Sequence, residues 1–217
     1  MSFLNQLKAQ AQAQAAQTAQ AAQGNTQAEN LAKTEAALKT TYLYLADLVK
    51  QLNVLAPDGP SFNIEGKSPW PAMKLVEFRL DARKKALRDQ EVTDYIAMGW
   101  RIVPRAGSPV SASASASFLP DFQRIEAALQ AGAVKYERVQ VRSPDKPNVT
   151  LVRFDYVTEA RGSLTIQADH DQGLLNFRLG NVNALNVIHR SYPAAQLHTD
   201  VLDELAKLIV GHPSRFI

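Results

Sequence analysis

The chain has 217 residues, no cysteine, and a formal net charge of +3 from 24 basic and 21 acidic residues. This length suits one domain, with or without an appendage, and is enough to bury a core without a metal or disulfide. The lack of cysteine excludes disulfides, thiolate catalysis and the common structural zinc sites. No segment has the apolar length of a membrane span or of a secretory signal, so we expect a cytoplasmic protein that does not bind membranes.

The chain begins with a segment rich in Ala and Gln. We assign residues 1–24 to an N-terminal arm, helical or mobile, and residues 25–217 to a single domain. Apart from Thr18, residues 9–23 are all Ala or Gln, which favour a helix but bury little apolar surface. Deletion of residues 1–24 should therefore leave the domain folded with nearly the same melting temperature. If copies of the chain associate, we expect the contact through this arm or through the helix that follows.

A long amphipathic helix is predicted from about Gln27 to Leu55, after an interruption at Gly24 and Asn25. Its apolar stripe occupies about three positions in seven, the width typical of a helix packed on a globular core rather than of a coiled-coil seam. We therefore expect this helix to lie on a sheet. The stripe consists of Leu31, Leu38, Tyr42, Leu45, Leu48, Val49, Leu52 and Leu55.

Two adjacent runs of alternating apolar and polar residues follow, at 74–86 and 92–103. Alternation with a period of two on both sides of one turn predicts an antiparallel hairpin with one buried face. We expect Val76, Phe78, Met98 and Trp100 on that buried face.

The remaining elements are shorter. Residues 106–117, rich in Ser and Ala, are predicted to be a mobile low-complexity loop. A helix over 120–131 starts near Pro120 and ends at Gly132. A last helix near 199–210 has Thr199 as a candidate cap. Between these two helices, alternating runs predict strands near 134–142, 149–158, 163–168, 174–179 and 184–190.

This order predicts an α+β fold: an antiparallel, curved sheet of about seven strands packed by a long N-terminal helix, a short middle helix and a C-terminal helix. The order is similar to that of helix-grip folds, in which a curved sheet wraps a long helix around a cavity. A cavity between sheet and helix would bind a small or lipid-like molecule. The aromatic residues that we assign to its lining, and that would serve equally in a core, are Trp100, Phe154, Tyr156 and Phe177.

One motif resembles part of a nucleotide site. Gly66-Lys67-Ser68 matches the end of a phosphate-binding loop, but Ser61 stands where that loop needs its first Gly. Pro71 also disfavours a helix after the motif. We therefore predict a turn here, and Trp70 is expected to pack this loop onto the body of the protein.

The histidines and neighbouring carboxylates do not predict a metal centre. Asp169, His170 and Asp171 could ligate a cation, but they lie between two strands and just before Gly173, as a solvated turn does. No other histidine has a partner at a metal-binding or catalytic spacing. We thus assign no catalytic, cofactor-binding or metal-binding residue and expect no cofactor.

Basic residues gather around the predicted hairpin, as they do in proteins that hold phosphate backbones. Acidic residues alternate with them and weaken the field, so we predict a solvated face without specific binding to DNA or RNA. The basic set consists of Arg79, Arg83, Lys84, Lys85, Arg88 and Arg101.

These observations favour a non-enzymatic role in assembly or protein–protein interaction, and binding of a small or lipid-like ligand is the alternative. An enzyme would require an active site assembled from residues distant in the sequence.

Overall fold

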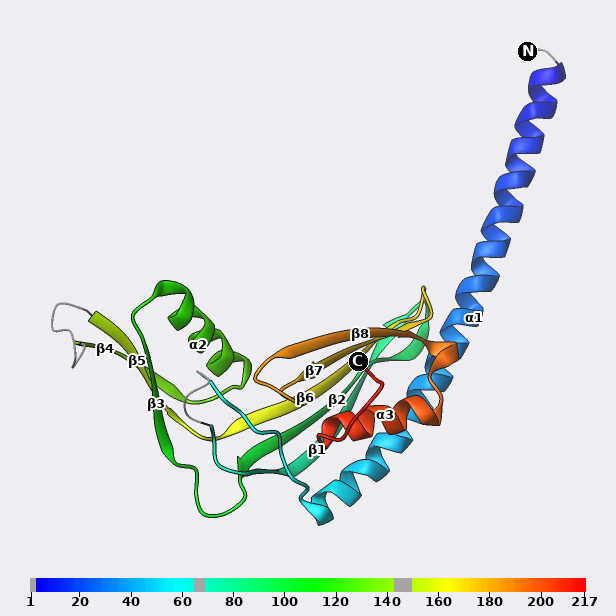
Figure 1. The fold of residues 1–217 in the computed structure, drawn as a ribbon. Coiled ribbons are helices and arrows are strands. Elements are labelled where there is room, and N and C mark those ends of the chain that lie inside the picture. The colour runs from blue at the N-terminus through cyan, green and yellow to red at the C-terminus, as the bar shows by residue number, and fades with distance from the viewer. Residues whose placement is uncertain (1–2, 65–68, 143–149) are drawn as a thin grey trace.

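A computed structural model describes residues 3–64, 69–142 and 150–217, with side chains from Thr26 onward (Figure 1). The Gly66-Lys67-Ser68 motif lies outside the described residues. The described part has three α-helices and eight antiparallel strands, so the predicted α+β class is confirmed. In chain order they are α1 (Phe3–Leu55), β1 (Met73–Leu87), β2 (Gln90–Pro104), β3 (Ser111–Ala116), α2 (Leu119–Ala131), β4 (Tyr136–Arg142), β5 (Thr150–Val157), β6 (Ala160–Asp169), β7 (Leu174–Gly180), β8 (Val187–Pro193), the 3₁₀ turn η1 (Ala194–Gln196) and α3 (Thr199–Ile209).

The strands form two sheets rather than one. A five-stranded sheet has the order β1-β2-β6-β7-β8, and a three-stranded sheet has the order β3-β5-β4. Helix α1 lies against β1, β2 and β6 and also contacts η1 and α3, whereas α2 lies against β3 (Figure 1). None of the helices in the described residues combines the length and the hydropathy that crossing a bilayer requires.

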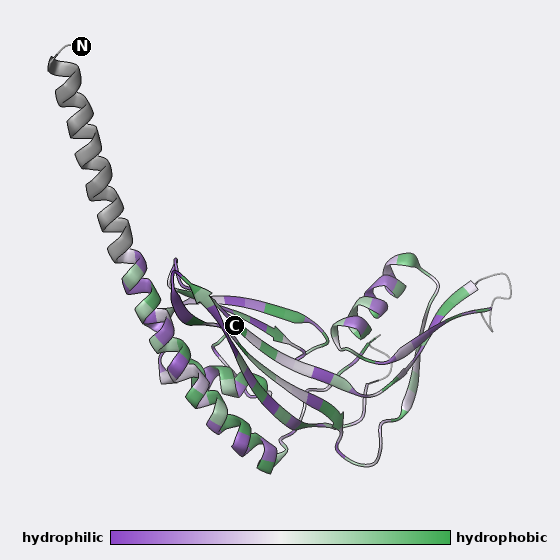
Figure 2. Ribbon diagram, turned by 180° about the vertical axis from the view of Figure 1, so that it is seen from behind, coloured by the Kyte–Doolittle hydropathy of each residue, from purple (hydrophilic) through white to green (hydrophobic). Residues whose placement is uncertain are grey.

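Helix α1 packs on the sheet as predicted. Polar and apolar residues are mixed along its described part, as Figure 2 shows, and the apolar stripe faces the body. Tyr42 and Leu55 are exposed, although the prediction placed them in the stripe, and two threonines take buried positions instead. The hydroxyl of Thr41 donates to the carbonyl of Ala37 at 2.8 Å, which satisfies it inside the core. The buried residues of this stripe are Thr34, Ala37, Leu38, Thr41, Leu45 and Leu52.

The backbone of α1 is helical through Gly24 and Asn25, where the sequence predicted an interruption. A single glycine costs a helix only about 1 kcal/mol, which neighbouring helix formers offset. The side chains of residues 1–25 lie outside the described part, so the separate behaviour of the arm stays a prediction.

The predicted hairpin is confirmed as β1 and β2, and Phe78, Met98 and Trp100 are buried. Val76 is only half-buried, and Leu75 takes the core position. The reason is a shift in register between Val76 and Arg79, where β1 carries one extra residue and the φ of Glu77 is +56°. Such a bulge reverses the faces of the strand before it, so strict alternation assigned Val76 to the wrong face.

A strand replaces part of the loop that the sequence predicted. Residues 111–116 form β3, which pairs with β5 along its whole length, so the prediction for 106–117 is wrong in this part. Ala114 and Ala116 are buried, and the serines that alternate with the alanines of this strand are exposed. The alternation is present, but the small difference in hydropathy between Ala and Ser conceals it.

The shorter helices agree with the prediction except at one cap. Helix α2 has Pro120 in its first turn and Gly132 at its C-cap. Helix α3 begins at Thr199, so the residue at the N-cap is His198, and no side chain caps this end.

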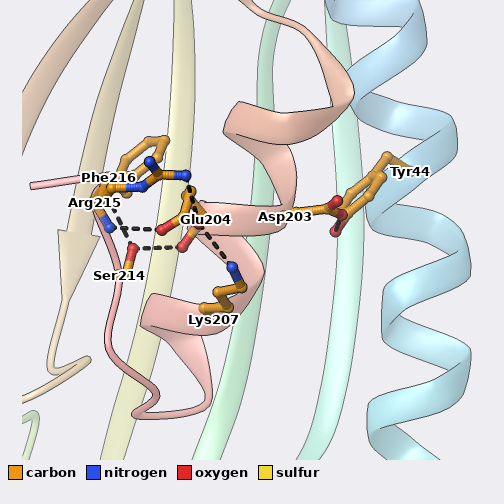
Figure 3. A network of polar contacts seen from close by, with 7 residues as sticks. All are labelled: Tyr44, Asp203, Glu204, Lys207, Ser214, Arg215 and Phe216. Atoms are coloured by element: carbon orange, nitrogen blue, oxygen red, sulfur yellow. Dashed lines mark hydrogen bonds and ion pairs between the residues drawn. The ribbon is translucent and has the colours of Figure 1, made fainter.

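Polar contacts fasten the C-terminal segment to α3 and α3 to α1 (Figure 3). The Glu204 carboxylate accepts a hydrogen bond from the backbone N–H of Arg215 at 2.6 Å and an ion pair from Lys207 at 2.7 Å. The bond from Lys207, followed by that from Arg215, lowers the pKa of Glu204 to about 2. The hydroxyl of Tyr44 donates to Asp203 at 2.6 Å, and burial together with this carboxylate raises the pKa of Tyr44 above its usual value.

Candidate functional site

A groove of about 570 Å³ lies between α1 and the β1–β2 hairpin. We call it the α1 groove. Its volume falls within the range of roughly 300–1,000 Å³ that is usual for ligand pockets. Five of the lining residues are apolar or aromatic, Ala36, Leu38, Tyr42, Ala82 and Ile96, and four are polar, Glu35, Lys39, Lys84 and Thr93.

The size of the side chains accounts for the open space. Ala36 on α1 and Ala82 on β1 are both exposed and carry only a methyl group, so neither fills the gap between its element and the other. Leu38 and Ile96 are buried and close the inner side of the groove. Tyr42 is partly exposed at the border with solvent.

Glu35 is held in place by contacts with the body. Its Oε1 accepts a hydrogen bond from the backbone N–H of Thr93 at 2.9 Å, and its Oε2 accepts one from the Thr93 hydroxyl at 3.1 Å. The Nε2 of His170 lies 2.8 Å from the same Oε1. The carboxylate is therefore already engaged by donors of the protein, and we do not expect it to be free for a ligand.

His170 corrects one expectation about the β6–β7 turn. The turn is present, and Arg88 pairs with the carboxylate of Asp171 at its surface. His170 itself is only 3% exposed and contacts Glu35, whereas the sequence predicted a solvated residue. Glu35 lies far away in the sequence, and no local pattern signals the contact.

The cations of the groove differ in their partners. Lys84 forms an ion pair with Glu91 at 2.7 Å, and the hydrogen bond to this carboxylate is the main reason why the pKa of Lys84 is raised. Lys39 has no ion pair among the side chains that the structure describes. Lys39 is therefore the cation that is available to an anionic group of a ligand.

The four aromatic residues assigned to a cavity lining are buried and belong to separate ring contacts. Trp100 stacks on Phe78 with 5.6 Å between ring centroids, and Tyr156 stacks on Trp70. Trp70 thus packs the loop before β1 onto the body, as predicted. Phe154 meets Tyr136, and Phe177 meets Tyr192 and Phe216. All four belong to the hydrophobic core, and none of them lines the α1 groove.

Carboxylates pair with most of the basic set. The pairs are Lys84–Glu91, Lys85–Asp94, Arg88–Asp171, and Arg101 with both Glu77 and Glu159. Arg83 lies over the ring of Tyr95 at 5.9 Å, and Arg79 has no ion pair within the described part of the chain. These pairs reduce the positive field of the hairpin, and the absence of nucleic-acid binding stays a prediction.

The described residues contain no group of three or more metal-ligating side chains. His189, His198 and His212 are exposed and lie apart from the α1 groove. Comparisons of the chain with protein-family models, with curated proteins and with solved structures give no match.

Sequence reasoning named three residues of the α1 groove but in other roles, Leu38 and Tyr42 in the apolar stripe and Lys84 in the basic set. Glu35, Ala36 and Lys39 flank the apolar stripe of α1, so its periodicity does not mark them. On β1, Ala82 has too little apolar character to stand out. The signal in the sequence that points to the groove is a small residue, Ala36, beside the apolar stripe of a helix that packs on a sheet.

Proposed function

We propose that the protein is a non-enzymatic binding module that holds an amphipathic small molecule with an anionic head in the α1 groove. The observation that carries this proposal is a mostly apolar groove between helix and sheet with one cation, Lys39, that has no carboxylate partner among the described residues. Apolar walls with a few convergent polar groups are typical of small-molecule sites. A cytoplasmic location remains part of the proposal.

The apolar part of the ligand supplies most of the affinity. Each buried CH₂ group contributes about 0.8 kcal/mol, so an alkyl chain of several carbons outweighs the head. An ion pair between exposed groups contributes only about 0–1 kcal/mol, so Lys39 mainly sets the direction in which the ligand lies.

Dodecanoate and dodecanol, both kept below their aggregation limits, test this proposal by isothermal titration calorimetry and native mass spectrometry. We expect saturable one-to-one binding of both, with dodecanoate the tighter ligand. Lys39→Gln should remove that difference and leave the binding of dodecanol unchanged.

A matched pair of substitutions on β1 tests the location. Ala82→Phe fills the α1 groove and should weaken binding of both probes at least tenfold. Ala86→Phe adds the same ring at an exposed position of the same strand, outside the groove, and should leave binding unchanged. The proposal fails if wild-type protein binds neither probe, or if the two variants bind equally well.

Assembly through α1 is the second candidate, and exposed apolar residues on this helix favour it. Leu43 is 60% exposed and Val54 is 83% exposed, so burying them against a second copy would be favourable. Analytical ultracentrifugation tests this candidate. If the chain self-associates through α1, the double variant Leu43→Ser with Val54→Ser should lower its oligomeric state, whereas Ala82→Phe should not.

A further inference from the structure

A second hollow, of about 560 Å³, lies where the two sheets meet. We call it the junction hollow. Its residues come from β2, from the end of β5, from the connection between β5 and β6, from the start of β6, and from the segments that follow β2 and α2. It has no residue in common with the α1 groove. The lining consists of Arg101, Pro109, Ala133, Lys135, Val157, Glu159, Ala160 and Arg161.

The lining carries more positive than negative charge. Three cations face one carboxylate, Glu159, and that carboxylate is already bound to Arg101 by Nε at 2.9 Å and Nη2 at 2.8 Å. A second carboxylate, Glu77, accepts from Nη1 of Arg101 at 2.5 Å. These bonds raise the pKa of Arg101 and fix its guanidinium. Within the described part of the chain, Lys135 and Arg161 have no carboxylate partner.

The β2–β6 pairing places Arg161 directly opposite Arg101. Like charges directly opposite each other on neighbouring strands are destabilising. Glu77 and Glu159 compensate Arg101 but leave Arg161 with its charge unpaired. Because two carboxylates bind Arg101, they offset its repulsion with Arg161, and no ion pair among the described residues engages Arg161 itself.

The backbone around Arg161 is held firmly. Its N–H donates to the carbonyl of Gly132 at 3.0 Å, and its carbonyl accepts from Asn181 Nδ2 at 2.7 Å. Asn181 and Ala133 have positive φ angles of 61° and 49°, as does Glu77 with 56°. Of these three residues, Ala133 lines the hollow, and its positive φ is uncommon for a residue other than Gly or Asn.

We infer that the junction hollow binds the phosphate group of a small phosphate monoester. A phosphate monoester carries a charge of about −1.5 to −2 at neutral pH, which balances the two unpaired cations, Lys135 and Arg161. Arg161 suits bidentate contact with phosphate oxygens. Arg101 has five N–H donors, of which its carboxylates use three, so two remain for the ligand. The volume exceeds that of phosphate alone and leaves room for an organic group.

Inorganic phosphate and phenyl phosphate are the probes, titrated by calorimetry at an ionic strength held constant with sodium chloride. We expect saturable binding of both, tighter for phenyl phosphate, and a rise in melting temperature. Phenylacetate carries the same ring with a single carboxylate and should bind at least tenfold more weakly than phenyl phosphate.

Substitutions of lining and non-lining residues test whether phosphate binds in the junction hollow. Arg161→Ala should weaken phosphate binding at least tenfold, and Lys135→Glu should abolish it. Arg178→Ala removes an exposed arginine of β7 that does not line the hollow, and it should change affinity less than twofold. Without phosphate, Arg161→Ala should melt close to the wild-type temperature, because Arg161 is exposed and has no ion pair among the described residues.

Three results would overturn the inference. These are the absence of saturable binding to wild-type protein, equal losses in Arg161→Ala and Arg178→Ala, and equal affinity for phenylacetate and phenyl phosphate. If Arg161→Ala does not fold, the comparison of Lys135→Glu with Arg178→Ala decides the question alone.

Discussion

Glu35 and Asn53 lie about five helical turns apart on the same side of α1, and each hydrogen-bonds beside one of the two register shifts of the β1–β2 pair. Asn53 Oδ1 accepts from the N–H of Phe78 at 2.8 Å, and its Nδ2 donates to the carbonyl of Phe78 at 2.9 Å. Glu35 receives the N–H of Thr93 next to the second shift. The helix thus provides hydrogen bonds at the places where the strand ladder is interrupted.

Asn53→Ala should lower the free energy of unfolding by about 1–3 kcal/mol, because it leaves a donor and an acceptor of Phe78 without partners. Urea denaturation measures the change. The control is Gln51→Ala, at an exposed position of the same helix, which should change stability by less than about 0.5 kcal/mol. Equal effects of the two substitutions would show that the contact with Phe78 does not stabilise the fold.

Gly162→Ala should destabilise the protein by about 1–3 kcal/mol or more. A Cβ at this position would lie 1.9 Å from the indole of Trp100, a buried ring that also stacks on Phe78. Gly99→Ala, on the neighbouring strand, would have its nearest neighbour atom at 4.0 Å and should be neutral or slightly stabilising. Thermal denaturation of both variants provides the comparison, and a Gly162→Ala protein as stable as wild type would contradict the packing.

The stability that Glu204 confers should depend on pH. Its pKa is lowered from the usual 4.5 to about 2, so its contribution is fully present above about pH 5 and is lost as the pH falls towards 2. Denaturant unfolding from pH 7 to pH 2 should show wild type more stable than Glu204→Gln at neutral pH, with the two curves converging in acid. Glu137→Gln, at an exposed site outside this network, is the control. A difference that stays constant down to pH 2 would refute the linkage.

Phe216→Ala should destabilise the protein by about 3–5 kcal/mol, since it leaves a cavity among buried aromatic rings. Phe216 packs against Phe177 and Tyr192, and the Tyr192 hydroxyl donates to its carbonyl at 2.8 Å. Its neighbour Ile217 is 42% exposed, so Ile217→Ala should cost less than about 0.5 kcal/mol. Guanidinium unfolding curves separate these outcomes, and a mild effect of Phe216→Ala would mean that the terminal segment is not part of the core.

Periodicity in the sequence predicts most elements, because seven strands and the two later helices carry clear contrast between apolar and polar residues. It does not reveal β3, where alanine and serine differ too little. Local patterns also cannot detect the extra residue at Glu77, which depends on the pairing with β2 and on the bonds from Asn53.

The candidate sites were less predictable than the fold, because both depend on residues that approach only in three dimensions. Arg101 was selected for its charge, but its opposition to Arg161 requires the β2–β6 register. Similarly, Ala36 and Ala82 define a groove only after α1 crosses the hairpin.

The contact between Tyr44 and Asp203 joins residues 159 positions apart, which affects how the chain matures on the ribosome. Helix α1 is synthesised first, but its stripe finds β1, β2, η1 and α3 only later. The stripe can pack on β1 and β2 soon after these strands are translated, but native docking on α3 waits until Asp203 has emerged. Contacts between residues so far apart in the sequence slow folding. Apolar surface of α1 that packs on α3 is therefore exposed during synthesis, and such surface is prone to aggregation.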